Sequence, residues 1–220
     1  DYDLWFRLGL ISPAVYVPEL WALYRLHSRS KTVSMLPNLV ADSARILERF
    51  FLRADLPPEL RCLGDRTVAR THGWASALHW VVGDVPTSRF HFREAMSRFP
   101  GLLDDAVFHQ KILASWFRNQ DRDPVQVASD FFQVIASSAP VSRATVRRSS
   151  ARAFAALAAT GCRGKKARLR AAVQAVLNDG RWIWKKHILL VLIESWVGST
   201  AWEYLRRVKR LLTSGGAHVC

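Results

Sequence analysis

The feature that most constrains this chain is the spacing of its apolar residues, which changes at Pro37. From there to residue 212, apolar side chains recur every three or four residues, the period of an α-helix with one buried face. Clusters of proline and glycine interrupt the pattern and predict the breaks between helices. The expected helices cover residues 37–54, 59–82, 86–98, 103–119, 124–137, 142–160, 164–178, 181–195 and 199–212.

The segment before Met35 has a different pattern. Leu4, Trp5, Phe6 and Leu8 lie at helical spacing behind a first turn that contains two acids, which predicts a short helix over residues 1–10. Beyond Pro13, the runs AVYVPE and LWALYRLH alternate in part and predict two short strands or extended segments. The fold is therefore predicted to be mainly α, with a short α/β segment at its start.

One segment, at about residues 69–100, has a more specific spacing. Gly83, Phe92, Ala95 and Pro100 fall where a tetratricopeptide-type helical hairpin places its turn glycine, packing aromatic, small residue and terminal proline. No second copy follows at the period of such repeats, so the pattern predicts one hairpin and not a repeat array. We divide the chain into regions 1–34, 35–140 and 141–220.

The positive charge is confined to one region. Residues 141–220 hold 16 of the 32 Lys and Arg residues and three of the 18 Asp and Glu residues, so they carry +13 of the net charge of +14. A uniform basic bias is excluded, and a local surface that attracts anions is predicted. In the last expected helix, four cations flank an apolar face: Arg206, Arg207, Lys209 and Arg210.

Two interpretations of this basic region remain open. The charges are either a solvated face over a buried stripe or a binding surface. Among binding surfaces, an anionic membrane is favoured, because each Lys or Arg near such a surface adds about 1 kcal/mol of attraction. Nucleic acid is the weaker alternative, since the chain has no zinc-finger or RNP-type motif.

Composition describes a folded protein of the soluble type. Half of the residues are hydrophobic and the mean hydropathy is close to zero. The longest aliphatic run, Ile188 to Ile193, is far shorter than the roughly 20 residues of a membrane-spanning helix. Three widely separated cysteines suit a reducing compartment, so we expect a cytoplasmic protein. A basic region that binds a membrane would place it peripherally at the inner face of the plasma membrane.

Three short blocks near the start are arranged in a specific order. They are DYDLWFRL from Asp1, YVPE from Tyr16, and YRLHSRSKT from Tyr24. Taken singly, Asp1 and Asp3 are ordinary acids at a helix start, where the helix dipole favours negative charge. Taken together, the blocks resemble the final catalytic segment of family 2 glycosyltransferases, inverting enzymes with the GT-A fold.

That resemblance implies roles for individual residues. Asp1 corresponds to the general base that takes the proton from the acceptor hydroxyl, and Asp3 to a supporting group at the helix start. His27 matches a position that holds the divalent metal, Mg or Mn, or the diphosphate. Arg25 would neutralise the departing diphosphate, and Trp5 would face an acceptor sugar or pack against the sheet.

The resemblance also implies what the chain does not contain. A segment that begins inside a catalytic motif is expected to be cut from a larger enzyme whose nucleotide-binding half carries the donor site. The parent would transfer a sugar from a nucleotide-sugar donor to a glycan or lipid-linked acceptor, whereas this fragment alone would be inactive and bind no metal. The alternative is a non-catalytic helical interaction module whose basic face binds an anionic membrane surface or another polyanion.

Overall fold

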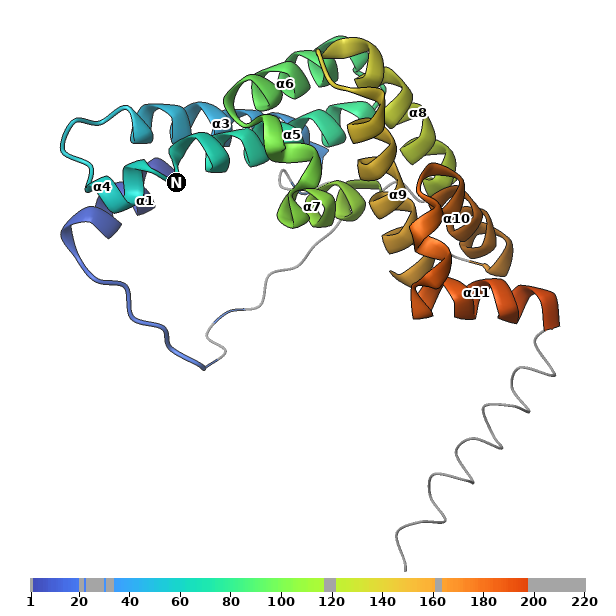
Figure 1. The fold of residues 1–220 in the computed structure, drawn as a ribbon. Helices are drawn as coiled ribbons and strands as arrows, with labels where there is room; N and C mark the ends of the chain where they lie inside the picture. Colours follow the sequence, from blue (N-terminus) through green and yellow to red (C-terminus); the bar gives the residue numbers. More distant parts are fainter. Residues whose placement is uncertain are drawn as a thin grey trace, which may run out of the picture. The chain divides into compact units, whose positions relative to one another are not determined.

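The computed structural model describes residues 2–19, 22, 30, 34–116, 122–160 and 164–197. Within these ranges the chain is built from α-helices and short 3₁₀ helices, and it forms no strand (Figure 1). None of the helices in these ranges has the length and apolar character needed to cross a membrane. The elements are α1 (Tyr2–Ile11), α3 (Leu36–Phe51), α4 (Pro58–Arg61), α5 (Gly64–Val81), α6 (Val85–Arg98), η1 (Pro100–Asp104), α7 (Ala106–Trp116), α8 (Pro124–Ser138), α9 (Arg143–Thr160), α10 (Lys165–Asn178), η2 (Gly180–Trp184) and α11 (Lys186–Val197).

The contacts divide the chain into two compact units. The first comprises residues 1–120 and 130–142, and the second comprises residues 121–129 and 143–220. Helix α8 contributes its first residues to the second unit and its later residues to the first. Our division into regions 1–34, 35–140 and 141–220 stays a prediction.

In the first unit, α5 packs against α3, α6 and α7. An aromatic cluster fills the core, with the ring of Phe131 lying 6.0 Å from Trp80, 6.4 Å from Phe92 and 5.5 Å from Trp116. All four of these side chains are buried, and large aromatic side chains contribute much of the apolar area of a core.

Two local features position α5 and α6 as a hairpin. Gly83 lies between the two helices with a φ of +86°, a conformation that residues with a Cβ rarely adopt. Asp84 then caps α6, because its carboxylate accepts a hydrogen bond from the backbone N–H of Thr87 at 3.2 Å. The expected hairpin is present as two packed helices, and its likeness to a tetratricopeptide stays a prediction.

The order of elements α5–α6–η1–α7 occurs again as α9–α10–η2–α11. The lengths are 18, 14, 5 and 11 residues in the first set and 18, 14, 5 and 12 in the second. In both sets the first two helices pack together and the 3₁₀ helix contacts the helices on either side of it. We call these sets the first copy and the second copy. Since the first copy begins at Gly64 and the second at Arg143, a search at the much shorter tetratricopeptide period misses the second copy.

Backbone angles at the ends of the 3₁₀ helices support the equivalence. The residue before η1, Phe99, has φ −141° and ψ 89°, and the residue before η2, Asp179, has φ −149° and ψ 104°. The residues after them agree more closely: Asp105 has φ −81° and ψ 121°, and Lys185 has φ −81° and ψ 122°. The two copies therefore turn the chain in the same way at the same point.

Several expected elements differ from those observed. Residues 14–18, in the first run expected to be a strand or an extended segment, form no strand, because a strand requires a hydrogen-bonded neighbour and none of the described residues supplies one. The helix expected over 59–82 is two helices, α4 and α5. The helices expected over 103–119 and 181–195 begin later, at Ala106 and Lys186, because the residues before them form the 3₁₀ turns η1 and η2. The last expected helix, 199–212, lies outside the described residues.

Candidate functional site

The helix α1 carries the part of the catalytic motif that can be located. Asp3 lies in its first turn and forms an ion pair with Arg7, with 3.1 Å between Oδ2 and Nε. Both side chains are more than half exposed, so the pair contributes little to stability. This is the helix-start position that the sequence predicted for Asp3, and its supporting role in catalysis stays a prediction.

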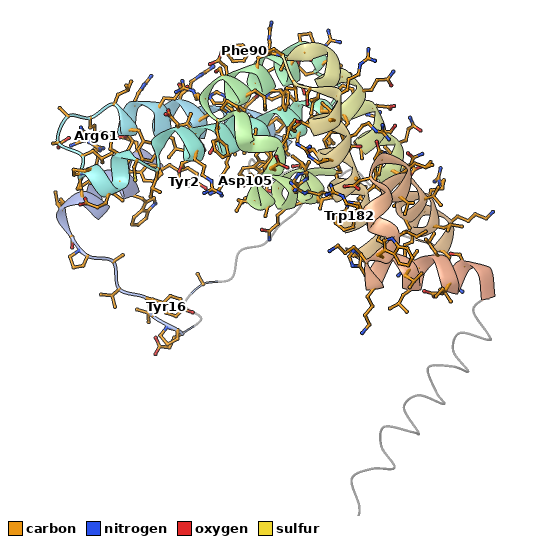
Figure 2. The ribbon with its side chains drawn as sticks, in the orientation of Figure 1. Tyr2, Tyr16, Arg61, Phe90, Asp105 and Trp182 are labelled. Carbon is orange, nitrogen blue, oxygen red and sulfur yellow. The ribbon has the colours of Figure 1, made fainter. Side chains whose placement is uncertain are left out.

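Aromatic contacts hold α1 against α3. The ring of Phe6 lies 5.0 Å from that of Phe50 and 6.4 Å from that of Tyr2, which is 62% exposed. Trp5 is 65% exposed, which leaves its indole accessible to a ligand. Figure 2 labels Tyr2 on α1.

The other residues of the predicted site cannot be placed. Asp1, Arg25 and His27 lie outside the described residues, so the arrangement of the predicted base, diphosphate ligand and metal ligand stays a prediction. The predicted anion-binding cations of the last helix also lie outside them: Arg206, Arg207, Lys209 and Arg210. In the part of the chain that is described, no group of three or more His, Cys, Asp or Glu side chains is arranged to hold a metal ion.

The second copy contains a hollow of about 360 Å³ that the sequence did not predict. We call it the η2 hollow, and it is lined by Arg148, Arg152, Asp179, Arg181, Trp182 and Lys185. Its residues come from α9, from η2 and from the residues flanking η2. Four cations and one carboxylate therefore line the hollow, and Trp182 adds an aromatic side chain. Figure 2 labels Trp182 in the second copy.

The single carboxylate of the η2 hollow is fully engaged. Asp179 Oδ1 accepts from Arg181 Nε at 2.9 Å and from the backbone N–H of Arg181 at 3.1 Å, and Oδ2 accepts from Arg181 Nη2 at 2.7 Å. The hydrogen bonds from the Arg181 side chain lower the pKa of Asp179 to about 2, so it stays ionised. Asp179 also caps η2. The same residue therefore fixes the start of η2 beside the hollow and neutralises the charge of Arg181.

Two further cations of the η2 hollow have looser surroundings. Arg148 donates to the hydroxyl of Thr145 at 3.3 Å, and its charge also helps to lower the pKa of Asp179. Lys185 is exposed and follows η2 directly. The lining residues together carry more positive than negative charge, which favours an anionic ligand.

Two other hollows are balanced by their own residues. One, of about 350 Å³ in the first unit, contains Glu48 paired with Arg98 at 2.6 Å, and its Arg61 donates to the backbone carbonyls of Ala54 and Leu56. The other, of about 290 Å³ in the second unit, contains an ion pair between Asp123 and Arg170 at 2.7 Å. Neither offers the excess charge of the η2 hollow.

The first copy contains a comparable pair of arginines. Arg66 and Arg70, one turn apart on α5, both donate to Asp105, which follows η1. The four N···O distances lie between 2.8 and 3.1 Å, and the Asp105 side chain is 0% exposed. Asp105 also caps α7 by accepting from the backbone N–H groups of Val107 and Phe108 at 3.0 Å. We call this cluster the Asp105 clamp.

Burial by itself would raise the pKa of Asp105. The hydrogen bonds from Arg70 and Arg66 outweigh this effect and hold the pKa well below its usual value. The Asp105 clamp is therefore a closed ionic cluster whose anion belongs to the chain. Figure 2 labels Asp105 beside the helices of the first unit.

A third polar cluster lies between α3, α5 and α6. His72 Nδ1 lies 2.8 Å from His91 Nδ1, so one proton lies between the two rings, and His72 Nε2 lies 3.2 Å from Glu48 Oε1. His79 stacks on His91 at 5.5 Å, and its Nδ1 lies 3.3 Å from Asp84 Oδ2 without hydrogen-bond geometry. Burial, with the charges of His72 and His79, lowers the pKa of His91 to about 4.

Comparison of the chain with family models, with curated proteins and with solved structures finds no significant match. The resemblance to family 2 glycosyltransferases accordingly rests on the three sequence blocks alone.

The sequence offered one signal for the η2 hollow. Arg148 and Arg152 are four residues apart and so lie on one side of a helix, and the Asp-Gly-Arg-Trp stretch from Asp179 marks a break between helices. The excess of cations after residue 140 was recognised, but the pattern could not show which of them converge. Convergence depends on the way α9 packs against α10 and η2.

Proposed function

We propose that this chain is the C-terminal part of an inverting glycosyltransferase of family 2, in which a short catalytic segment is followed by helical units. The observation that carries the proposal is the order of the three blocks that begin at Asp1, Tyr16 and Tyr24. The position of Asp3 in the first turn of α1 is compatible with it.

In this proposal Asp1 acts as the general base. It accepts the proton of the acceptor hydroxyl while the oxygen attacks the anomeric carbon of the nucleotide-sugar donor, and the nucleoside diphosphate leaves with inversion. A carboxylate at a helix start is kept ionised by the helix dipole, which suits a base. Arg25 pairs with the departing diphosphate through its fork of donors, and Trp5 offers an accessible indole to an acceptor sugar.

The proposed metal ligand is His27. A neutral imidazole suits Mg or Mn less well than carboxylates do, so His27 would bind the ion together with carboxylate ligands. When bound, the divalent ion supplies positive charge for the leaving diphosphate. The donor-binding half would contribute the other ligands, so we expect transfer activity from the parent enzyme and none from this chain alone.

The test is a transfer and donor-hydrolysis assay of the full-length protein that contains this chain. Asp1→Asn is expected to lower turnover by about a hundredfold or more, because the base contribution of a positioned side chain is typically 10²–10⁴. Asp42→Asn, which removes an equal charge from the exposed surface of α3 outside the three blocks, is the matched control. Unchanged turnover in Asp1→Asn contradicts the assignment of the base.

The sequence upstream of Asp1 gives an independent test. A strand-rich stretch that ends in Glu, with an Asp-x-Asp motif roughly a hundred positions earlier, supports the glycosyltransferase proposal. A translational start directly before Asp1 contradicts it.

As a second candidate, we infer a helical interaction module whose basic region binds a polyanion such as an anionic membrane surface. The excess of positive charge in the η2 hollow favours it. Co-sedimentation with vesicles that contain anionic lipid, compared with neutral vesicles, tests this function. We expect the chain to bind the anionic vesicles. This binding should be reduced by replacing the last-helix cations Arg206, Arg207, Lys209 and Arg210. Equal binding to both kinds of vesicle contradicts this function.

A further inference from the structure

The two copies keep a constant interval from their second helix onward. Lys165, which begins α10, comes 80 positions after Val85, which begins α6, and the same interval separates the starts of η2 and η1 and those of α11 and α7. Ser195-Trp196 on α11 also stands 80 positions after Ser115-Trp116 on α7. Each serine donates to the backbone carbonyl four residues earlier, Ser115 at 3.0 Å and Ser195 at 2.8 Å. Helices α7 and α11 are therefore equivalent position by position.

The equivalent faces of these two helices differ in burial. On α7, four residues at helical spacing are each at most 8% exposed: His109, Ile112, Leu113 and Trp116. The corresponding positions on α11 include Leu189, which is 41% exposed, and Leu192 and Ile193, which are partly exposed. We call these three residues the α11 stripe. It is an apolar surface that lacks the cover of its counterpart on α7.

In the first copy, the next helix in the chain supplies apolar side chains to α7. The ring of Trp116 lies 5.5 Å from that of Phe131 and 6.1 Å from that of Phe132, both on α8. These two rings are buried, as are Val125 and Ala128 on the same side of α8. An apolar face of α8 therefore contributes to the cover of α7.

The sequence after α11 repeats this apolar face. Four residues stand 80 positions after the buried residues Val125, Ala128, Phe131 and Phe132, and all four are apolar: Leu205, Val208, Leu211 and Leu212. They share one face of the last expected helix, which lies outside the described residues. The interval that relates α7 to α11 therefore also relates α8 to this segment.

The cations of the segment fall mainly at positions that are open on α8. Three of them correspond to exposed or partly exposed residues: Arg206 to Gln126, Lys209 to Ser129 and Arg210 to Asp130. The fourth, Arg207, corresponds to Val127, which is buried on a different side of α8. A segment that packs through its apolar face keeps these charges in water, which avoids the cost of burying them.

We propose that residues 205–212 pack against the α11 stripe as α8 packs against α7. The occupant of this surface is then a segment of the same chain, which follows α11 closely, so packing requires closure of a short connection only. The inference depends on neither proposed function. It leaves the cations of the last helix facing outward, where an anionic surface can reach them.

The test is amide hydrogen–deuterium exchange of the whole chain without lipid, followed over α11. Val208→Asn places a polar amide on the apolar face and is expected to speed exchange of the α11 amides by about tenfold, as loss of the burial of one valine implies. Lys209→Asn is the matched control, because it creates the same side chain one position away and off that face. We expect less than about twofold from the control. Equal acceleration by both variants, or none by Val208→Asn, overturns the proposal.

A substitution on α11 tests the same contact from the other side. Leu189 is already 41% exposed, so Leu189→Asn should leave α11 folded and speed exchange of residues 205–212 by about tenfold. Lys186→Asn, at another exposed position of α11, is the matched control. Unchanged exchange of residues 205–212 in Leu189→Asn contradicts the contact.

Two changes of condition separate other occupants of the α11 stripe. Protection of α11 that falls when the chain is diluted identifies a second copy of the chain, and protection that requires anionic vesicles identifies a membrane. Either result overturns the proposal, whereas protection that is independent of concentration and of lipid supports it. Failure of this proposal leaves the glycosyltransferase proposal unaffected, because that proposal depends on Asp1.

Discussion

The first and second copies share one backbone and differ in how they neutralise charge. In the first copy, a buried carboxylate joins two arginines and caps the next helix, so the site is complete within the chain. In the second copy, the corresponding residue is Lys185, and four cations line a hollow with one engaged carboxylate. The same turn of the chain therefore carries a buried ionic cluster in one copy and a hollow lined mostly by cations in the other.

The difference shows that similar packing does not fix the role of a site. The helix lengths and the angles around η1 and η2 are nearly the same, while the residue that follows the 3₁₀ helix is a buried acid in one copy and an exposed lysine in the other. A buried carboxylate stabilises a fold only where partners balance its charge, so we expect the Asp105 clamp to matter more for stability than the exposed Lys185. Four changes in the chain or its conditions test this difference, beginning with the largest.

Replacing Asp105 with alanine should break the first copy. The substitution removes a buried partner of Arg66 and Arg70 and the cap of α7, so we expect a loss of about 3 kcal/mol in the free energy of unfolding. Urea denaturation measures it. Asp42→Asn removes an exposed carboxylate that pairs with Arg45 and should cost less than about 0.5 kcal/mol. Equal effects in the two variants mean that the Asp105 clamp does not stabilise the unit.

Lowering the pH should destabilise the first copy and leave the second nearly unaffected. The folded-state pKa of His91 is lowered to about 4, so between pH 6.5 and pH 4 the unfolded chain binds the extra proton and stability falls as the pH falls. We expect a loss of about 2 kcal/mol over this range. At the corresponding position, the seventh of α10, the second copy has the buried residue Ala171.

The check is a series of urea denaturations from pH 7 to pH 4 on the unmodified chain and on His91→Gln. The variant should lose most of this pH dependence, although Glu48, His72, His79 and Asp84 lie around the same cluster. An unchanged slope in His91→Gln contradicts the assignment to His91.

Adding one methyl group at Gly73 should disturb the close approach of α5 to η1 and α7. A Cβ there would lie 2.8 Å from the ring of Phe108 and 3.1 Å from Leu102, both fully buried. We expect Gly73→Ala to cost about 1–2 kcal/mol through overpacking. Gly9→Ala, where a Cβ meets nothing within 4 Å, is the matched control and should be neutral or slightly stabilising. Thermal unfolding compares the two.

Replacing Lys185 with glutamine should have the smallest effect on stability. Lys185 is exposed and follows η2, as the buried Asp105 follows η1 in the first copy. We expect a change of less than about 0.5 kcal/mol in the free energy of unfolding, because an exposed charge contributes little. A loss as large as that of Asp105→Ala contradicts the difference between the copies.

The periodicity of the sequence predicted most of the helices, because proline and glycine mark their ends. The expected helix 86–98 is α6 (Val85–Arg98) and the expected helix 164–178 is α10 (Lys165–Asn178). The 3₁₀ turns were missed, since η1 and η2 are five residues each and their apolar residues continue the pattern of the next helix.

The second copy was missed because its residue types differ from those of the first copy. The helices of the two copies are alike in length and in burial, which the string of letters does not show. His91 corresponds to Ala171 and Asp105 to Lys185, so the two copies show little likeness as strings of letters. For the same reason the Asp105 clamp could not be predicted. Arg66 and Asp105 are far apart in the chain, and only the packing of α5 against η1 and α7 brings them together.

The most direct test of the central claim is a urea denaturation of Asp105→Asn beside Lys185→Gln. Asp105→Asn keeps the size of the side chain and removes the charge that Arg66 and Arg70 share, so we predict a loss of about 2 kcal/mol or more in the free energy of unfolding. For Lys185→Gln we predict a change of less than about 0.5 kcal/mol. Equal losses in the two variants would contradict the account.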